Sequence, residues 1–370
     1  MSQTADALII GGGIVGAACA QALATEKLRV TIVEPHTVGG GATAAGMGHL
    51  VVMDDSEAQF ALTRYSRDLW NAASHELPAE IEFERCGTLW IAADEEEMQA
   101  VRRKREFYTA RGVRAEELDS EALGDAEPHL RPGLAGALLV PDDAVIYAPC
   151  AARWLSRGSS VQLGVPVSKI VPGGVLLANG TRISAGLIIC AAGAWATALV
   201  PDLAIRPRKG HLAITDRYPG FVRHQLVELG YLKSAHGHSN ESVAFNIQPR
   251  KTGQVLIGSS RQYGQTHPGV DHALLRRMLS RALEYMPSLG KLQVIRTWTG
   301  FRAATPDSLP IIGPCPGREN VYLAAGHEGL GITTSLGTAQ LLADVMRGRA
   351  PAIDAAPYAP SRFEPAPAHV

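Results

Sequence analysis

The chain has 370 residues, of which 46% are hydrophobic and 19% charged, a composition typical of a globular protein with a large core. This composition excludes a disordered chain and a small scaffold held by disulfides. Lys and Arg number 35 against 36 Asp and Glu, a net charge of −1, so no electrostatic argument favours nucleic acid as a partner. The length favours two domains, or one domain with large insertions, and a small-molecule site is the function to look for.

The cysteines are odd in number and scattered, and they form no C-x-x-C pair. This usage predicts neither a disulfide framework nor a zinc site, so we expect a reducing, cytoplasmic location and no bound metal. One uncharged run, 7–24, is long enough to resemble a membrane span. Its four glycines within six positions would interrupt a continuous helix, and we therefore expect no direct membrane span. The cysteines are Cys19, Cys86, Cys150, Cys190 and Cys315.

The N-terminal stretch predicts a βαβ unit. A short apolar strand over 7–10 leads into the glycine-rich turn 11–16, which is followed by a small-residue helix over 17–24. A β-branched strand over 29–33 then ends in Glu34, eighteen positions after the last glycine of the turn. This order of strand, turn, helix and strand is typical of a nucleotide-binding fold.

The turn matches G-x-G-x-x-G at Gly11, Gly13 and Gly16. The first glycine permits a tight turn, the second lets the backbone approach a pyrophosphate, and the third packs the helix on the strand. The start of the helix points free N–H groups at the phosphates. Glu34 is placed to accept hydrogen bonds from an adenosine ribose, and its charge disfavours a 2′-phosphate.

The glycine pattern alone cannot separate NAD from FAD, but the next segment does. Residues 39–48 form a second glycine-rich loop, Gly-Gly-Gly-Ala-Thr-Ala-Ala-Gly-Met-Gly. A plain NAD-binding unit has no use for this loop, whereas a flavin laid along the sheet does. The segment therefore favours FAD over an NAD-linked dehydrogenase.

The rest of the chain has two textures. Apolar strands over 187–193 and 320–326 each run into Ala-Ala-Gly, and we interpret both as strands of the N-terminal sheet. Residues 211–258 alternate apolar and polar side chains as antiparallel strands do, and 274–285 has apolar residues at helical spacing. These segments predict a second, mixed layer. The proline-rich end from Pro351 is predicted to be a tail.

Three further motifs complete a resemblance to a known family. Residues 191–195 are similar to an A-x-G-x-W turn, 298–302 read W-x-G-x-R, and 324–332 read Ala-Ala-Gly-His-Glu-Gly-Leu-Gly-Ile. With the two glycine motifs, they make the chain resemble the D-amino acid oxidase family of flavoenzymes. The branch in question includes glycine oxidase, monomeric sarcosine oxidase and D-hydroxyproline dehydrogenase. The run 326–334 most resembles D-hydroxyproline dehydrogenase and the related cyanide-forming glycine dehydrogenase subunit, more than glycine oxidase.

The resemblance covers almost the whole chain and implies an α/β fold. A Rossmann-like FAD-binding domain with a parallel sheet is expected over residues 1–80, 145–205 and 295–370. An α+β substrate-binding domain with a mixed or antiparallel sheet is expected over 81–144 and 206–294.

The resemblance also implies FAD, bound non-covalently because no cysteine lies within 300–307, where monomeric sarcosine oxidase tethers its flavin. The helix starting near Gly331 would present N–H groups and a positive dipole end to the negative charge of reduced flavin. The residues expected to bind the cofactor are Gly11, Gly13, Ile14, Val15, Gly16, Glu34, Pro35, Ala42, Thr43, Gly46, Met47, Val167, Ala192, Gly193, Trp195, Gly300, Gly329, Leu330, Gly331, Ile332 and Thr333.

Arg302 is expected to bind a substrate carboxylate, because a guanidinium offers a two-pronged, permanently charged fit; the alternative is a surface ion pair. His327 and His49 are candidate catalytic residues near the expected flavin edge, and for both the alternative is a histidine bonded to backbone. His327 is also a candidate substrate contact. Asn246 and Tyr231 are further candidates, from the presumed substrate-binding domain.

The sequence departs from glycine oxidase at two positions. Gly329 stands nearest to where that enzyme places a second arginine, and Asn246 corresponds to its tyrosine. The resemblance therefore implies a site with a single carboxylate-binding arginine, a different polar contact and room for a ring.

The expected reaction is oxidation of the C–N bond of a small amino or imino acid by hydride transfer to flavin N5, for which no general base is obligatory. We expect D-hydroxyproline or D-proline as substrate and the pyrroline carboxylate as product. One alternative is an oxidase of glycine, sarcosine or an acyclic D-amino acid, and another is the flavin subunit of a multi-subunit amino acid dehydrogenase. A homo-oligomer or a partner electron-transfer subunit is left open.

Overall fold

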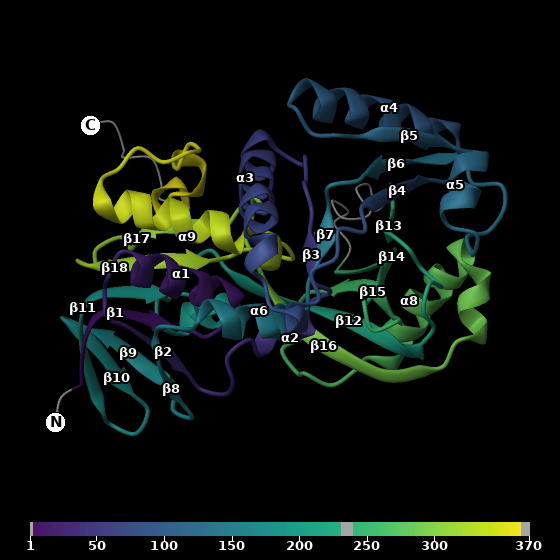
Figure 1. The fold of residues 1–370 in the computed structure, drawn as a ribbon. Coiled ribbons are helices and arrows are strands. Elements are labelled where there is room, and N and C mark those ends of the chain that lie inside the picture. The colour runs from purple at the N-terminus through teal and green to yellow at the C-terminus, as the bar shows by residue number, and fades with distance from the viewer. Residues whose placement is uncertain (1–2, 231–239, 364–370) are drawn as a thin grey trace, which may run out of the picture. The chain divides into compact units, whose positions relative to one another are not determined.

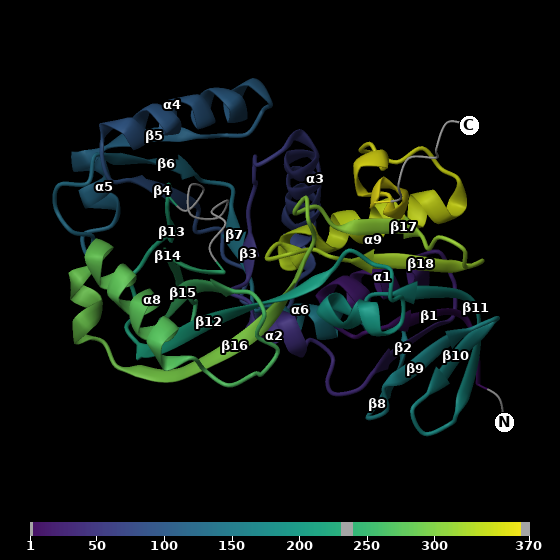
Figure 2. The same cartoon turned by 180° about the vertical axis from the view of Figure 1, so that it is seen from behind.

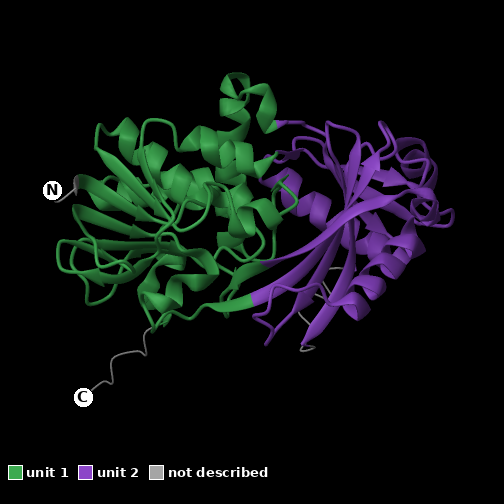
Figure 3. Cartoon of the chain, turned by 90° about the horizontal axis from the view of Figure 1, so that it is seen from below, with its two compact units in different colours: residues 1–81, 147–207, 301–370 green, residues 82–146, 208–300 purple. Residues whose placement is uncertain are grey.

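The computed structural model describes residues 3–230 and 240–363, which divide into two compact units (Figure 3). Unit 1 comprises residues 1–81, 147–207 and 301–370, and unit 2 comprises 82–146 and 208–300. Each unit has its own sheet and its own hydrophobic core. The assignment of FAD to one unit and of substrate to the other stays a prediction.

The sheet of unit 1 is mainly parallel, with the strand order β17-β18-β11-β1-β2-β8 (Figure 1). β1 (Gln3–Ile10) pairs in parallel with β11 (Arg182–Cys190) on one side and with β2 (Val30–Glu34) on the other. Residues 7–10 are at most 5% exposed, which explains their uninterrupted apolar sequence, because a central parallel strand is buried on both faces. β18 (Val321–Ala325) pairs with β11, as the two Ala-Ala-Gly strands predict.

Helices of unit 1 pack on one another beside this sheet. α1 (Ile14–Thr25) contacts α9 (Gly331–Arg347) and α6 (Ala148–Leu155), and α3 (Glu57–Ala73) contacts α9. The remaining elements of the unit are α2 (Gly41–Ala45), β3 (His49–Leu50), η1 (Ser74–Glu76), η2 (Ala79–Ile81), β8 (Ser160–Leu163), β9 (Val167–Val171), β10 (Gly174–Leu177), η3 (Gly193–Ala198), β17 (Ile311–Pro314), η5 (Ala356–Tyr358) and η6 (Pro360–Phe363).

The sheet of unit 2 is mixed, with the order β16-β12-β15-β14-β13-β4-β6-β5 (Figure 2). β13 (Gln225–Glu228) pairs in parallel with β4 (Thr88–Ala92), whereas its other neighbour, β14 (Glu241–Pro249), is antiparallel. α8 (His272–Tyr285) packs on β14 and on β15 (Gln254–Gln262). A parallel sheet and a mixed sheet in one chain confirm the predicted fold class. The other elements are α4 (Glu95–Ala110), β5 (Glu116–Asp119), α5 (Ser120–Ala126), β6 (Gly136–Val140), β7 (Ala144–Val145), β12 (Arg206–Arg217), η4 (Pro287–Lys291) and β16 (Val294–Ala304), of which β12 and β16 contain unit boundaries.

The proline-rich end is not a tail as far as Phe363, so that prediction was wrong. The side chain of Tyr358 is 1% exposed, and its hydroxyl donates to the Ala58 carbonyl at 2.6 Å. Arg362 forms an ion pair with Asp307 at 2.7 Å. A high proline content does not prevent packing here, because the Tyr358 and Arg362 side chains anchor the segment on unit 1.

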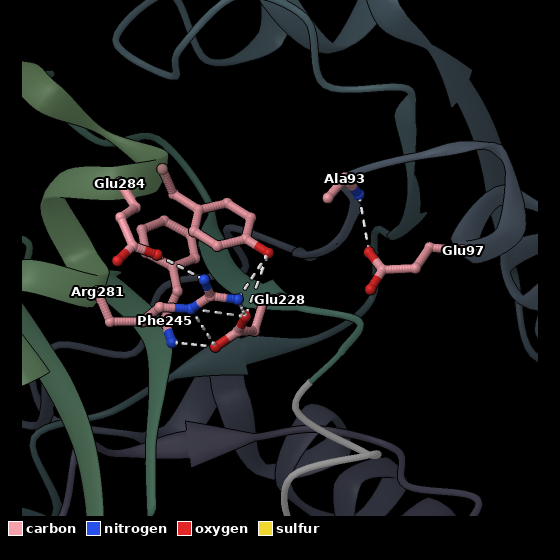
Figure 4. Close-up of polar contacts among 7 residues, drawn as sticks. Ala93, Glu97, Glu228, Phe245, Arg281 and Glu284 are labelled. Carbon is pink, nitrogen blue, oxygen red and sulfur yellow. Dashed lines mark hydrogen bonds and ion pairs between the residues drawn. The ribbon is translucent and has the colours of Figure 1, made fainter.

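A buried carboxylate fixes α8 to the sheet of unit 2 (Figure 4). Glu228, 2% exposed, accepts hydrogen bonds from the Phe245 amide at 2.6 Å and from the Tyr285 hydroxyl at 3.1 Å, and it forms an ion pair with Arg281. Burial, and then the charge of Glu228, raise the pKa of the Tyr285 hydroxyl, which therefore remains a proton donor. The β14–β15 register shifts between Val243 and Asn246. Glu228 thus satisfies a backbone amide at an irregularity in the sheet.

We predict that Glu228→Gln lowers the free energy of unfolding by about 2–4 kcal/mol. Losing one partner of a buried ion pair costs about 3–5 kcal/mol, and we discount this because the Arg281 side chain is 36% exposed. Glu284→Gln is the matched control, since Glu284 pairs with the same arginine but is 58% exposed; it should cost about 0–0.5 kcal/mol. Urea unfolding of both variants measures the difference, and equal costs would contradict the prediction.

Candidate functional site

The first glycine-rich turn of unit 1 is built for close approach of backbone. Gly11 has φ +106°, and a Cβ there would lie 2.6 Å from the Ala191 carbonyl oxygen, so no other residue fits. A Cβ at Gly16 would overlap the Gly11 carbonyl. Helix α1 begins at Ile14 with Gly13 as its N-cap, and its first turn has neither a side-chain cap nor an acidic residue. The N–H groups of this turn are therefore suited to an anion.

The second glycine-rich loop is hydrogen-bonded to the first turn. Thr43 Oγ1 accepts from the Ile14 amide at 3.0 Å, and the Gly39 amide donates to the Gly12 carbonyl at 2.8 Å. A Cβ at Gly13 would lie 3.3 Å from Thr43 Oγ1. Because Gly13 has no side chain, the space between the two loops stays open.

Glu34 lies at the end of β2, beside the same turn. Its Oε2 accepts from the Gly12 amide at 2.8 Å, and its Oε1 accepts from the His36 amide at 2.9 Å. Each carboxylate oxygen has lone pairs for a further donor. The side chain is therefore oriented by backbone and can accept hydrogen bonds from ribose hydroxyls.

The start of α9 meets both loops. A Cβ at Gly46 would lie 2.9 Å from Ile332 Cδ1, and a Cβ at Gly331 would lie 3.7 Å from Val15 Cγ2. Like α1, α9 begins without a side-chain cap and without an acidic residue in its first turn. Two uncapped helix starts and an oriented carboxylate thus converge within unit 1. This arrangement fits the phosphates and ribose of FAD.

Other residues expected to bind the cofactor lie around this cluster or apart from it. Ala192 is next to Gly11, 3.3 Å from the position of a Cβ there, and Gly193 follows in η3. Trp195 is 54% exposed and its ring meets Phe301 edge-on. Their roles stay predictions, as do those of the following: Pro35, just after β2; Ala42, in α2; Met47, buried; Val167, first residue of β9; Gly300, on β16; Leu330, the N-cap of α9.

Arg302 lies on β16, next to the start of α9. A Cβ at Gly329 would lie 3.5 Å from Arg302 Nε, and in the described part of the chain it would meet no other residue within 4 Å. The adjacent residue, Ala303, accepts a hydrogen bond from the Glu328 amide at 3.0 Å, which holds β16 against the segment before α9. We call the turn 11–16, the loop 39–48 and the start of α9 the glycine cluster. Arg302 thus places a permanent positive charge beside open space at the end of this cluster.

The two candidate histidines have partners inside unit 1. His327 is 7% exposed, and its Nε2 lies 3.0 Å from Thr338 Oγ1. Burial lowers the pKa of His327 to about 3, so its ring stays neutral. The carbonyl of His49 accepts from Thr333 Oγ1 at 2.8 Å. These contacts favour structural roles, and a catalytic role for either histidine stays a prediction.

The two candidates from the substrate layer are placed differently. Asn246 lies on β14 in unit 2, opposite Val227 and Gly258. It is 9% exposed, and its Oδ1 has no hydrogen-bond partner in the described part of the chain. Tyr231 lies outside the described residues.

Comparisons with known proteins bear on this site. The family model "DAO: FAD dependent oxidoreductase" matches residues 6–345. Glycine oxidase from Geobacillus kaustophilus is 30% identical over 98% of both chains. Its crystal structure superposes with a TM-score of 0.88, covering 98% of this chain and 100% of that one at 28% identity. Hydrogen cyanide synthase subunit HcnC from Pseudomonas aeruginosa is 27% identical over 100% of this chain and 99% of its own.

The chain belongs to the DAO family of FAD-dependent oxidoreductases. The predicted family, the predicted FAD and the predicted enzyme class are thereby confirmed. Of the two relatives above, one carries the name glycine oxidase and the other is a subunit of hydrogen cyanide synthase. The resemblance to D-hydroxyproline dehydrogenase rests on residues 326–334 alone.

The cysteines of this DAO-family chain are all free. Burial raises the pKa of the Cys19 thiol to about 12 and that of the Cys190 thiol to about 11, which makes both poor nucleophiles. In residues 3–230 and 240–363, no group of three or more His, Cys, Asp or Glu side chains could hold a metal ion. Nor does the same part of the chain contain a helix long and apolar enough to cross a membrane.

We predict that His327 makes the FAD-loaded protein lose stability in acid. Its pKa is lower in the folded than in the unfolded state, so its contribution is complete above about pH 6.5 and is lost as the unfolded chain takes up a proton below that pH. Relative to His327→Gln, the native chain should lose on the order of 1.4 kcal/mol per pH unit between about pH 6 and pH 4. Urea unfolding across this range measures it. The exposed His75→Gln is the control for the substitution itself, and parallel pH curves for the native chain and His327→Gln would refute the buried, neutral state.

Proposed function

We propose that the chain oxidises the C–N bond of a small amino or imino acid whose carboxylate is bound by Arg302. The observation that carries this proposal is the Arg302 guanidinium beside Gly329, at the end of the glycine cluster. A bidentate arginine is the usual partner of a planar carboxylate. The names of the relatives support an amino acid substrate.

FAD, when bound, supplies the acceptor for the hydride that leaves the substrate carbon. The chain itself binds and orients. Arg302 holds the carboxylate, the first turn of α9 presents N–H groups, and Glu34 holds the ribose. His327, neutral because of its burial, neither takes up a proton near pH 7 nor adds a second positive charge. An amine that reacts in its neutral form needs no base, and positioning supplies much of the rate.

We propose D-hydroxyproline or D-proline as the preferred substrate class. Gly329 is exposed, and beside it the only described neighbour of a Cβ would be Arg302. A second arginine would take up this space in a site shaped for glycine, whereas its absence leaves room for a pyrrolidine ring. Asn246, which lies in unit 2, corresponds to a tyrosine of glycine oxidase, and its buried amide oxygen can accept a hydrogen bond from an O–H or N–H group.

Glycine and sarcosine are the alternative substrates, favoured by the relatives named glycine oxidase. A role as the flavin subunit of a larger dehydrogenase is the alternative assembly, and the similarity to HcnC favours it. Different experiments distinguish these two alternatives. The first concerns the substrate that gives electrons to the flavin, and the second concerns the acceptor that takes them from it.

We predict that anaerobic cis-4-hydroxy-D-proline or D-proline bleaches the visible absorption of the bound flavin. Glycine, sarcosine and D-alanine, added in parallel, should bleach it more slowly, because a small substrate leaves the space beside Gly329 unfilled. Bleaching by glycine alone would move the assignment to the alternative substrate. Reoxidation on admission of air identifies an oxidase, whereas a flavin that stays reduced in air points to a partner acceptor.

We predict that Arg302→Met lowers kcat/KM for the amino acid about 10²- to 10³-fold. Removing one partner of a close charge pair costs about 2–5 kcal/mol, and about 1.4 kcal/mol is a tenfold change. Arg302→Lys keeps the positive charge but loses the two-pronged guanidinium. It should therefore raise KM, and its kcat/KM should lie between those of the native chain and Arg302→Met. Arg296→Met, an exposed arginine on the same strand, is the control. Equal kinetics for the Arg302 and Arg296 variants would refute the carboxylate site.

We also propose that FAD is held without a covalent bond. No cysteine occurs within 300–307, and Cys315, which follows, is 4% exposed with its sulfur directed at the Pro316 carbonyl. Acid precipitation of the yellow protein should release all of the flavin into the supernatant. Colour retained in the pellet would overturn this proposal and leave the rest unaffected.

A further inference from the structure

Ser66 of α3 makes two hydrogen bonds to the backbone of α9. Its hydroxyl donates to the Thr333 carbonyl at 2.5 Å and accepts from the Gly337 amide at 2.9 Å. The side chain is completely buried, with 0% exposure. Both partners lie within the first two turns of α9.

The two backbone groups that Ser66 contacts are four residues apart. In an α-helix, the amide of Gly337 and the carbonyl of Thr333 are hydrogen-bond partners of each other. The hydroxyl of Ser66 therefore bridges the two ends of a single helical bond.

Gly337 makes this approach possible. A Cβ at Gly337 would lie 2.9 Å from the Cβ of Ser66 and 3.1 Å from a methyl group of Leu62. Its backbone is helical, so the requirement for glycine here is one of space rather than of φ. The pairing of Ser66 with Gly337 thus sets how closely α3 and α9 cross.

Thr333 is held on its other side by the segment after the second glycine loop. Its Oγ1 donates to the His49 carbonyl at 2.8 Å, and its carbonyl is the group that Ser66 contacts. Thr333 lies two residues after Gly331, in the turn whose N–H groups face the glycine cluster. A shift of α9 along its axis would move these N–H groups relative to Val15 and Gly46.

We propose that Ser66 is a positioning residue for the cofactor: by bridging Thr333 and Gly337, it fixes the start of α9 against the end of the flavin that gains negative charge. This inference rests on the part of the proposed function that sets the first turn of α9 against the flavin. N–H groups and a helix N-terminus stabilise negative charge, and the effect falls off within the first turn. Their placement therefore acts more on the reduced than on the oxidised cofactor.

The test is the FAD-loaded, full-length Ser66→Ala variant. The substitution removes one hydroxyl and adds no volume, so the chain is expected to fold. The visible spectrum of the bound flavin should shift, and its midpoint potential should fall. If the reduced cofactor loses tenfold more affinity than the oxidised one, the two-electron potential falls by about 30 mV.

Tyr358→Phe is the matched control. Tyr358 is as buried as Ser66, and its hydroxyl also donates to a backbone carbonyl, at Ala58 in the first turn of the same helix α3. The control should lower the unfolding midpoint but leave the flavin spectrum and potential unchanged. Should Ser66→Ala fail to fold, Ser66→Cys keeps a weak donor and acceptor at the same position, and it should shift the potential in the same direction by less.

An unchanged spectrum and potential in a folded Ser66 variant would overturn the inference, since a purely structural serine would behave as Tyr358 does. Substrate specificity is measured separately, by flavin bleaching in the native chain. Failure of every amino acid to bleach the native flavin would refute the proposed reaction and leave the shift in Ser66→Ala as the test of positioning.

Discussion

The site depends on backbone N–H groups that the chain leaves for a ligand. Four helices in the described part of the chain begin with a side-chain cap: α3 with Ser56, α4 with Asp94, α5 with Asp119 and α8 with Asp271. α1 and α9 begin with Gly13 and Leu330 as N-caps, which supply no side-chain cap, and neither first turn has an acidic residue; the same is true of α2 and α6. The unmet donors of a helix start are costly if buried alone. Thr43 accepts from the Ile14 amide at the start of α1, and in our proposal a bound diphosphate and the anionic end of the flavin would accept from the donors that remain at these two helix starts.

The parts of this site that could be predicted from the sequence are those whose cause is local. Gly11 needs a positive φ and space for a carbonyl, and both follow from the turn itself, so its role could be predicted from spacing. The state of His327 could not, because burial against Thr338 depends on how α9 folds back on the segment before it. Ser66 carries no sequence signal at all. It is one serine in an amphipathic helix, and its partner Gly337 lies 271 residues away. The packing of the proline-rich segment could not be predicted for the same reason, because its anchors, Tyr358 and Arg362, contact residues that are distant in the sequence.

Similarity to glycine oxidase at 30% identity is stronger evidence for the fold and the cofactor than for the substrate. In our proposal the cofactor is held mostly through backbone, near glycines such as Gly11 and Gly16 where a Cβ would clash, so the proposed site tolerates change in most other side chains. In our proposal the substrate is bound by a few side chains, and the sequence departs from glycine oxidase at two candidate positions, Gly329 and Asn246. A difference at one buried polar contact is enough to change which amine is accepted, because an unpaired buried group costs about 1–3 kcal/mol. Family membership therefore sets the reaction class, whereas the choice of substrate within it, which we propose depends on the residues beside Arg302, is a matter for the substrate tests.

The reaction proposed for this site depends on how the reacting groups are positioned rather than on the protonation of a side chain. The residue best placed to be a base, His327, is buried and neutral, and Arg302 keeps its charge at every working pH. A hydride moves only over a short, well-aligned distance, so the protein contributes by holding one carboxylate and one helix start at fixed places. The pH dependence of the reaction then belongs mainly to the substrate, whose amine must lose a proton before it reacts. In this proposal, rigid contacts such as the Ser66 bridge matter because they hold the start of α9 in place.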